Sequence, residues 1–272
     1  MGSIPTLGST PLWMPASCAD DMGVTRSEPT PDTYGETWAE VYDELSQSRV
    51  GPPTDAQIDV LASLAGTGRA LELGIGTGRV ALPLAAREVA IHGVDASASM
   101  VARLREKPGG SDVPVTIGDM AEVVPDGPFR IVYVVFNTIF ALLTQARQVS
   151  CFRSVAGVLE PGGAFLLECF VPDLGRFTGG QCVRTTSVGS DGVWIEASTH
   201  DAVAQRVHSA AIHVSAAGVR ILPVEARYAW PSELDLMAAL AGLRLRHRWD
   251  GWDREPFTAS SGRHVSVYER PV

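Results

Sequence analysis

The sequence predicts a doubly wound α/β fold, in which a mainly parallel sheet carries helices on both faces and is interrupted by an antiparallel β insertion. Strand-like segments alternate with helix-like segments between residues 69 and 170. Residues 129–136 form a continuous apolar run rich in β-branched side chains, typical of a strand buried on both faces. Residues 175–229 break this alternation. We therefore expect a seven-stranded sheet with its last strand antiparallel, plus the insertion after the fifth strand.

The chain before the sheet predicts a tail and a helical cap. Residues 1–31 are rich in Pro, Ser, Thr and Gly, so we expect a disordered tail. Residues 33–45 place apolar side chains at three- and four-residue steps, and residues 54–64 do so again behind Thr54, a good N-cap. Residues 32–66 are therefore expected to form the cap.

The core is expected to comprise residues 67–174 and 230–272. In order, the pattern predicts a strand at 69–73, a helix at 79–86, a strand at 90–95, a helix at 97–106, strands at 113–117 and 129–136, a helix at 144–159, a strand at 164–170, a helix at 232–241, and strands at 243–249 and 264–270.

Residues 175–229 are expected to form the insertion, which would cover the substrate site. Asp191-Gly192 is a good two-residue hairpin turn. The predicted strands are 181–188, 193–200, 206–214 and 219–228.

Charge and composition exclude several classes of function. The net charge is −9, and residues 1–60 account for −8 of it, with 2 bases against 10 acids. The remaining body, with 20 bases against 21 acids, is nearly neutral and offers no basic stripe for nucleic acid or anionic lipid. No segment approaches the roughly 20 apolar residues of a membrane span, and we see no secretory signal. The 4 cysteines form no CxxC pair, so we expect reduced thiols, no metal site and a cytoplasmic protein.

A glycine-rich loop follows the first strand and points to a nucleoside cofactor. Gly74, Gly76 and Gly78 allow a sharp turn and close approach of a ligand to the backbone. Asp95, at the end of the second strand, is placed to accept hydrogen bonds from ribose hydroxyls. The loop can also be matched to the dinucleotide pattern, which leaves a nicotinamide-dependent oxidoreductase as an alternative. Glu72 argues against it, because a carboxylate there would repel pyrophosphate but suits S-adenosylmethionine, which carries an ammonium and no phosphate.

Three further features support that cofactor. Gly118-Asp119-Met120 closes the third strand, Met100 can pack on adenine, and the chain ends in a helix, a strand, a connection and an antiparallel strand. With these features the chain resembles the class I S-adenosylmethionine-dependent methyltransferases, which have a Rossmann-like fold, from about residue 33 to residue 270. The resemblance implies a cofactor-binding set of Tyr42, Glu72, Gly74, Gly76, Gly78, Asp95, Ala96, Met100, Asp119, Met120 and Asn137.

A closer resemblance is to the aminosugar N,N-dimethyltransferases of macrolide biosynthesis. It rests on residues 34–43, the Gly-Asp-Met triplet, the insertion and Ser261-Gly262-Arg263. It implies Tyr34 near the substrate, Tyr42 near the methionine end of the cofactor, and Arg263 at the substrate mouth. The chain departs from that family at Ala141, where the family has a substrate-facing histidine, and in its first motif, which has Glu72 and Ile75.

The expected function is methyl transfer to a small molecule, with an amine favoured. Glu168 ends the fifth strand and Trp252 lies in the last connection, so both are candidate substrate-binding residues. No catalytic base stands out, which fits an amine that presents its own lone pair. Methyl transfer to O or C, a non-catalytic relative, and a homodimer all remain open. Glu36, Glu40, Asp43 and Glu44 either form a solvated helix face or bias the entrance toward cationic acceptors.

Overall fold

The structure is a computed structural model that describes residue 30 and residues 32–44, 51–122, 125–190 and 192–272. The expected tail at residues 1–31 lies outside the described residues except for Thr30, as does Asp191 of the expected hairpin turn. No helix in the described part of the chain is both long enough and apolar enough to span a membrane.

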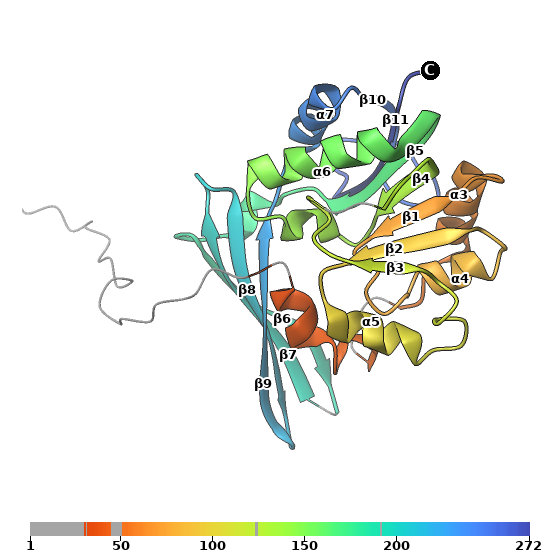
Figure 1. Cartoon of the computed structure of the whole chain (residues 1–272). Helices are drawn as coiled ribbons and strands as arrows, with labels where there is room; N and C mark the ends of the chain where they lie inside the picture. Colours follow the sequence, from red (N-terminus) through yellow and green to blue (C-terminus); the bar gives the residue numbers. More distant parts are fainter. Residues whose placement is uncertain (1–29, 31, 45–50, 123–124, 191) are drawn as a thin grey trace, which may run out of the picture.

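The main sheet has seven strands in the order β10-β11-β5-β4-β1-β2-β3 (Figure 1). Strand β11 runs antiparallel to both neighbours, and the other neighbouring strands are parallel, so the predicted fold class is confirmed. β5 starts earlier than expected, because the turn-like Pro161-Gly162-Gly163 continues the strand. The strands are β1 (Ala70–Leu73), β2 (Ile91–Asp95), β3 (Val115–Ile117), β4 (Phe129–Val134), β5 (Leu159–Phe170), β10 (Arg244–Trp249) and β11 (Arg263–Glu269).

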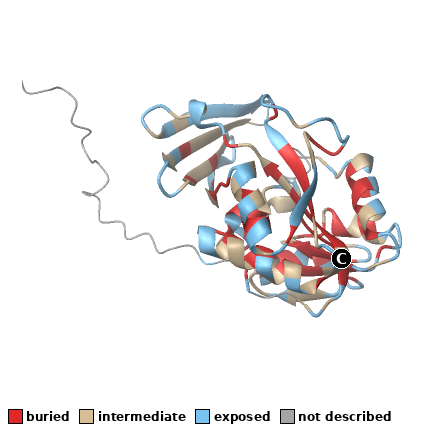
Figure 2. Cartoon of the chain, turned by 90° about the horizontal axis from the view of Figure 1, so that it is seen from above, coloured by how far each residue is buried: buried red, intermediate tan, exposed pale blue. Residues whose placement is uncertain are grey.

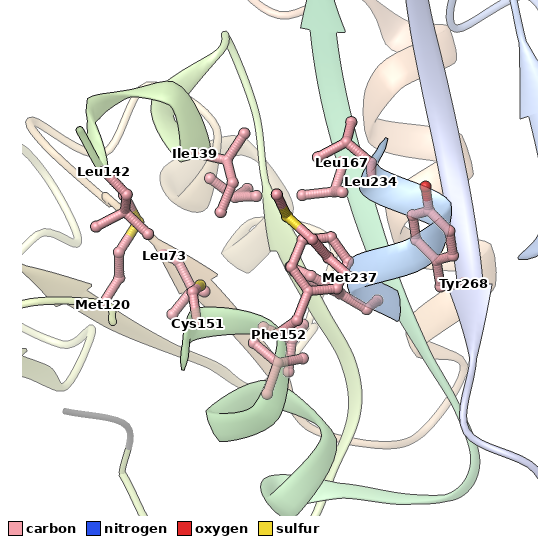
Figure 3. Close-up of a cluster of buried hydrophobic side chains, with 14 of the residues drawn as sticks. Leu73, Met120, Ile139, Leu142, Cys151, Phe152, Leu167, Leu234, Met237 and Tyr268 are labelled. Atoms are coloured by element: carbon pink, nitrogen blue, oxygen red, sulfur yellow. The ribbon is translucent and has the colours of Figure 1, made fainter. Parts of the chain in front are cut away.

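Helices cover both faces of this sheet (Figure 1). Helices α3 (Asp55–Ala65), α4 (Ala81–Ala85) and α5 (Ala98–Arg105) lie on one face, and α6 (Gln145–Val158) and α7 (Pro231–Leu240) lie on the other. Each face has its own apolar cluster. Figure 3 shows the cluster under α6 and α7, where Phe152, Met237 and Tyr268 converge. The carboxyl ends of the parallel strands stay open for a site.

The part of the expected cap that precedes α3 is described at residues 32–44 and is called the cap below. It begins with a shorter helix than the periodicity predicts. Helix α1 is Thr33–Trp38, and a turn at residues 39–41 separates it from helical residues 42–44. Trp38 is buried and donates from Nε1 to the carbonyl of Pro223 (3.1 Å), which anchors this helix to the insertion. Tertiary contacts thus outweigh local periodicity here.

The insertion is a second, four-stranded antiparallel sheet, as predicted. Its order is β6-β7-β8-β9, from β6 (Gln181–Gly189), β7 (Gly192–Asp201), β8 (Arg206–Ser215) and β9 (Gly218–Arg227). One face packs against α1 through Ala211 and Leu222. Figure 2 shows that buried residues gather in the main sheet and its helices, whereas the insertion is mostly exposed or intermediate.

Candidate active site

A cavity of about 300 Å³ opens at the carboxyl ends of β1, β2 and β3. The cap lies along one side, and the segment after η1 (Thr138–Ala141) lies along another. Most of the residues predicted to bind cofactor or substrate line this cavity: Tyr34, Tyr42, Gly74, Gly76, Asp95, Ala96, Met100, Asp119 and Met120.

The three loop glycines have different structural reasons. All have positive φ, at 72° for Gly74, 54° for Gly76 and 78° for Gly78. A Cβ on Gly74 would lie 2.4 Å from Cγ2 of Thr138, and one on Gly78 would lie 2.3 Å from Cδ1 of Leu104. A Cβ on Gly76 would meet nothing within 4 Å. Gly76 is therefore the glycine that leaves open space, whereas Gly78 lies outside the cavity and allows close packing on α5.

Asp95 binds the backbone on both sides of the site. Its Oδ2 accepts from the Gly76 amide (2.7 Å) and its Oδ1 accepts from the Ser97 amide (2.9 Å). Burial raises the pKa of this carboxyl, against the lowering effect of those two hydrogen bonds. Ser97 in turn caps α5 by accepting from the Met100 amide (3.1 Å). One carboxylate thus joins the glycine loop to the start of α5.

Glu72 does not line the cavity. Alternation along β1 directs it to the face covered by α3 and α4, where it is 2% exposed and accepts a hydrogen bond from the Tyr133 hydroxyl (3.0 Å). Burial raises the pKa of this carboxyl to about 8. The amide of Ala81, the first residue of α4, also donates to it. Its contacts therefore join β1 to β4 and to the start of α4.

The wall beside β3 combines sulfur, carboxylate and guanidinium groups. Met100 and Met120 are buried, at 3% and 9% exposed. Asp119 accepts from the Ala121 amide (2.8 Å) through Oδ1 and forms an ion pair with Arg147 through Oδ2. Arg147 comes from α6 and also lines the cavity. This wall offers both an apolar surface and fixed polar groups.

The cap closes the cavity and is tied down by two of its acids. Tyr34 stacks on Trp38 with ring centroids 5.3 Å apart, and Tyr42 is half-buried. Glu36 accepts from the Ser99 hydroxyl (2.5 Å) and from the Ser97 hydroxyl (2.7 Å), and these hydrogen bonds lower its pKa. Asp43 pairs with Lys107 (2.8 Å). These two acids dock the cap, so they are not free solvated charges at an entrance.

The remaining predicted site residues lie away from this cavity. Asn137 adopts a left-handed conformation, and its Oδ1 accepts from the Phe170 amide (2.7 Å), so it joins the ends of β4 and β5. Glu168 accepts from the Phe136 amide (3.0 Å) and from Nε1 of Trp252 (2.8 Å). Trp252 is 7% exposed and packs in the apolar cluster under α3 and α4, so it does not line this cavity. Arg263 donates to the carbonyl of Asp250 (3.2 Å).

Several residues that line the cavity are not predicted from the sequence. Ser97 could have been found from its position two residues after a strand-end aspartate, where an N-cap is common. Arg147 lies on α6 and pairs with Asp119, which follows β3, and Arg206 comes from β8 in the insertion. Only tertiary structure brings these two to the site. Ala141 does line the cavity, at the position where the resembling family has histidine.

The cavity wall holds few groups that could take up a proton. Among the described residues, neither histidine nor cysteine lines it, and no group of three or more His, Cys, Asp or Glu could hold a metal ion. Burial raises the pKa of the Tyr42 phenol, so it stays a neutral hydroxyl. The geometry therefore suits binding and alignment better than acid–base catalysis.

Comparison with known proteins identifies the family. Residues 70–163 match the family described as "Methyltransferase domain". A cypemycin N-terminal methyltransferase from a Streptomyces species is 31% identical over 242 residues, covering 88% of this chain and 98% of that protein. The CcbJ methyltransferase from Streptomyces caelestis has a similar structure, with a TM-score of 0.83 and 41% identity over 90% of this chain and 100% of that one. An amino pentose methyltransferase from Micromonospora echinaspora shares the fold, at a TM-score of 0.60 and 22% identity over 90% and 99% of the two chains. The chain belongs to the class I S-adenosylmethionine-dependent methyltransferases.

Proposed function

We propose that this enzyme methylates an amine nitrogen of a small molecule in natural-product metabolism. The observation that carries the proposal is the shortage of proton acceptors around the cavity. Its two carboxylates, Asp95 and Asp119, are both engaged by backbone amides, and no histidine or cysteine lines the described wall. A neutral amine needs no base before it attacks, whereas a hydroxyl or a carbon acid gains much more from one.

The residues of the cavity fit S-adenosylmethionine. Gly76 leaves room for a ligand against the backbone, and Asp95, which lines the cavity, would accept from the ribose hydroxyls. Asp119 would accept from the adenine amino group, with Met100 and Met120 packing on the ring. Gly74, Ala96 and Tyr42 would surround the rest of the cofactor. Glu72, Gly78 and Asn137 would act indirectly, by holding the loops.

When bound, the cofactor supplies a methyl group activated on a sulfonium. The chain's own part is to align the acceptor in line with that methyl and to exclude water. Tyr34 and Ala141 would contact the acceptor, and the cap would shield it. The nitrogen gains the methyl and releases its proton to solvent, so no protein base is required. Glu168, Trp252 and Arg263 remain candidates for the outer substrate surface.

The relatives support nitrogen as the methylated atom. One is named for methylating the N-terminus of cypemycin, and a structural neighbour is named for acting on an amino pentose in calicheamicin biosynthesis. An amine is the feature these two acceptors share. The finer resemblance to aminosugar N,N-dimethyltransferases remains a prediction, as does a cytoplasmic location.

The acceptor class can be tested with matched compounds. Three acceptors sharing one carbon skeleton would carry a secondary amine, a hydroxyl or an activated methylene. Release of S-adenosylhomocysteine and the mass of the product would be followed for each. We expect turnover of the amine alone, rising with pH as the free base forms. Faster turnover of the hydroxyl or carbon acceptor would refute the proposal.

We also propose a homodimer, formed through the outer face of the insertion. Strand pairing puts apolar rows on this face, including Val188, Val214 and Val219 in one row and Ile221 in the next. Val188, Val219 and Ile221 are 75%, 64% and 61% exposed. Four strands of about ten residues span roughly 19 by 34 Å. Two such faces together provide about 1,300 Å², within the range of stable interfaces.

Sedimentation velocity can test this dimer. Ile221→Glu should give monomers, because it places a charge in the proposed interface. Arg220→Glu, which alternates to the opposite face of β9, serves as the matched control and should stay dimeric. A monomeric wild type at micromolar concentration would contradict the proposal.

A further inference from the structure

The cap is fastened to both loops that surround the proposed cofactor site. At one point, Glu36 accepts from the Ser97 hydroxyl (2.7 Å), the Ser99 amide (3.1 Å) and the Ser99 hydroxyl (2.5 Å). Ser97 is the N-cap of α5 and Ser99 lies in its first turn, shortly after Asp95. At the other, Asp43 Oδ1 accepts from the Thr77 hydroxyl (2.6 Å). Thr77 lies between Gly76 and Gly78. The two ties thus join the cap to the segment that follows Asp95 and to the glycine loop.

Lys107 completes the second tie. Its Nζ donates to Asp43 Oδ1 (2.8 Å) and to the carbonyl oxygen of Thr77 (2.8 Å). Thr77 is 1% exposed, so its polar groups depend on these partners. A lysine ammonium has three donors in a compact head and can serve two acceptors at once. Lys107 is also the only lysine of the chain; its other basic residues are arginines.

This contact has to change if the cavity is to open on the cap side. Tyr34, Gly35 and Tyr42 all line the cavity from the cap, and Tyr42 directly precedes Asp43. Moving this wall outward would separate Asp43 from Lys107 and Thr77. Lys107 does not line the cavity and so lies apart from the proposed methyl transfer.

We propose that Lys107 is a positioning residue that latches the cap over the bound cofactor and thereby sets the rate of cofactor exchange. This inference rests on the proposed cofactor site. The ammonium holds the Thr77 carbonyl and the Asp43 carboxylate together, so the cap stays closed against the glycine loop until these contacts break. Loss of the latch speeds dissociation of S-adenosylhomocysteine and weakens its binding, and it leaves the methyl-transfer step unchanged.

Stopped-flow dissociation of S-adenosylhomocysteine from the full chain tests the latch. Lys107→Met should release the product about 5- to 10-fold faster, the size of effect expected for a partly exposed charge-assisted contact. Asp43→Asn should act similarly, and the double variant should add little to either. Lys107→Arg keeps the charge and should fall between wild type and Lys107→Met. The single-turnover methylation rate should be the same in all four variants.

A control variant and a salt series separate the latch from general effects. Arg103→Met removes an exposed ion pair with Glu106 at the end of α5, just before Lys107 in the chain, and should leave dissociation unchanged. Added salt should speed dissociation from wild type but not from Lys107→Met, because screening weakens the ion pair. The salt series on wild type also serves if a variant folds poorly.

The outcomes distinguish the latch from the proposed function. If wild type binds no S-adenosylhomocysteine, the proposed cofactor site is wrong, and the latch with it. If wild type binds it but Lys107→Met and Arg103→Met release it at the same rate, the latch is wrong and the site stands. Additive effects of Lys107→Met and Asp43→Asn, or a slower single-turnover rate, would also refute it.

Discussion

The glycine-loop edge of the main sheet and the inserted sheet reach the same cavity by opposite means. At the loop, Gly74 and Gly76 are set by backbone conformation, and Asp95 at the end of the neighbouring strand is held by a short hydrogen bond from the Gly76 amide. The insertion contributes through contacts between residues far apart in the chain, such as Trp38 with Pro223 and Arg227 with Gln148. The loop is held by its backbone conformation and nearby hydrogen bonds, whereas the insertion depends on its attachment to the rest of the fold.

A buried polar network attaches the insertion to the helices of the main fold. Arg227 is 5% exposed and donates to Gln148 (2.6 Å), Glu233 (2.7 Å) and Gln205 (3.0 Å). It thereby joins β9 to α6 and α7. If attachment is what holds the insertion in place, this residue should matter more for folding than any at the loop.

Replacing Arg227 should have the largest effect. Arg227→Ala removes the guanidinium that pairs with Glu233 and Gln148 and should lower the free energy of unfolding by about 3–5 kcal/mol. Arg220→Ala, exposed on the same strand, should change it by less than about 0.5 kcal/mol. Urea denaturation measures both. A loss below about 1 kcal/mol for Arg227→Ala would show that the network does not secure the insertion.

A methyl group on Gly78 should come next. Gly78→Ala combines a left-handed backbone with a Cβ 2.3 Å from Leu104, and should lower the free energy of unfolding by about 2–4 kcal/mol. Gly157→Ala is the control: it lies in α6 with nothing within 4 Å and should stabilise by up to about 1 kcal/mol. Equal melting temperatures for the two variants would contradict a geometric role for Gly78.

Asp95 should affect cofactor binding in addition to the backbone contacts it makes with Gly76 and Ser97. Asp95→Asn removes one charged acceptor and should weaken S-adenosylhomocysteine binding about 10- to 100-fold by calorimetry. Asp59→Asn, which breaks an exposed pair with Arg87, should bind as wild type does. Unchanged affinity in Asp95→Asn would place the ribose elsewhere.

The effect of Glu72 on stability should be visible as a pH dependence. Its pKa in the folded state, about 8, lies above the ordinary value of 4.5, so the folded protein holds the extra proton between these values. The free energy of unfolding should fall as pH rises through this window, by at most about 1.4 kcal/mol per unit. Glu72→Gln should lack this slope. Parallel pH profiles of urea denaturation for the two proteins would show that Glu72 is already ionised.

How much could be predicted from the sequence follows the same division. The strand order around Gly74 and Asp95, the antiparallel last strand and the four inserted strands were all predictable, because they depend on local patterns and topology rules. The direction of Glu72 was not, since alternation within a four-residue strand sets its face only once the helices are placed. The contributions of Arg147 and Arg206, and the burial of Trp252 on Glu168, arise from tertiary contacts that no local pattern records.

The most direct test of the central claim is a calorimetric titration of the full chain with S-adenosylhomocysteine and, separately, with a nicotinamide dinucleotide. The arrangement of Gly76, Asp95 and Asp119 predicts one binding site per chain for S-adenosylhomocysteine and no heat from the dinucleotide. Binding of the dinucleotide without S-adenosylhomocysteine would contradict it.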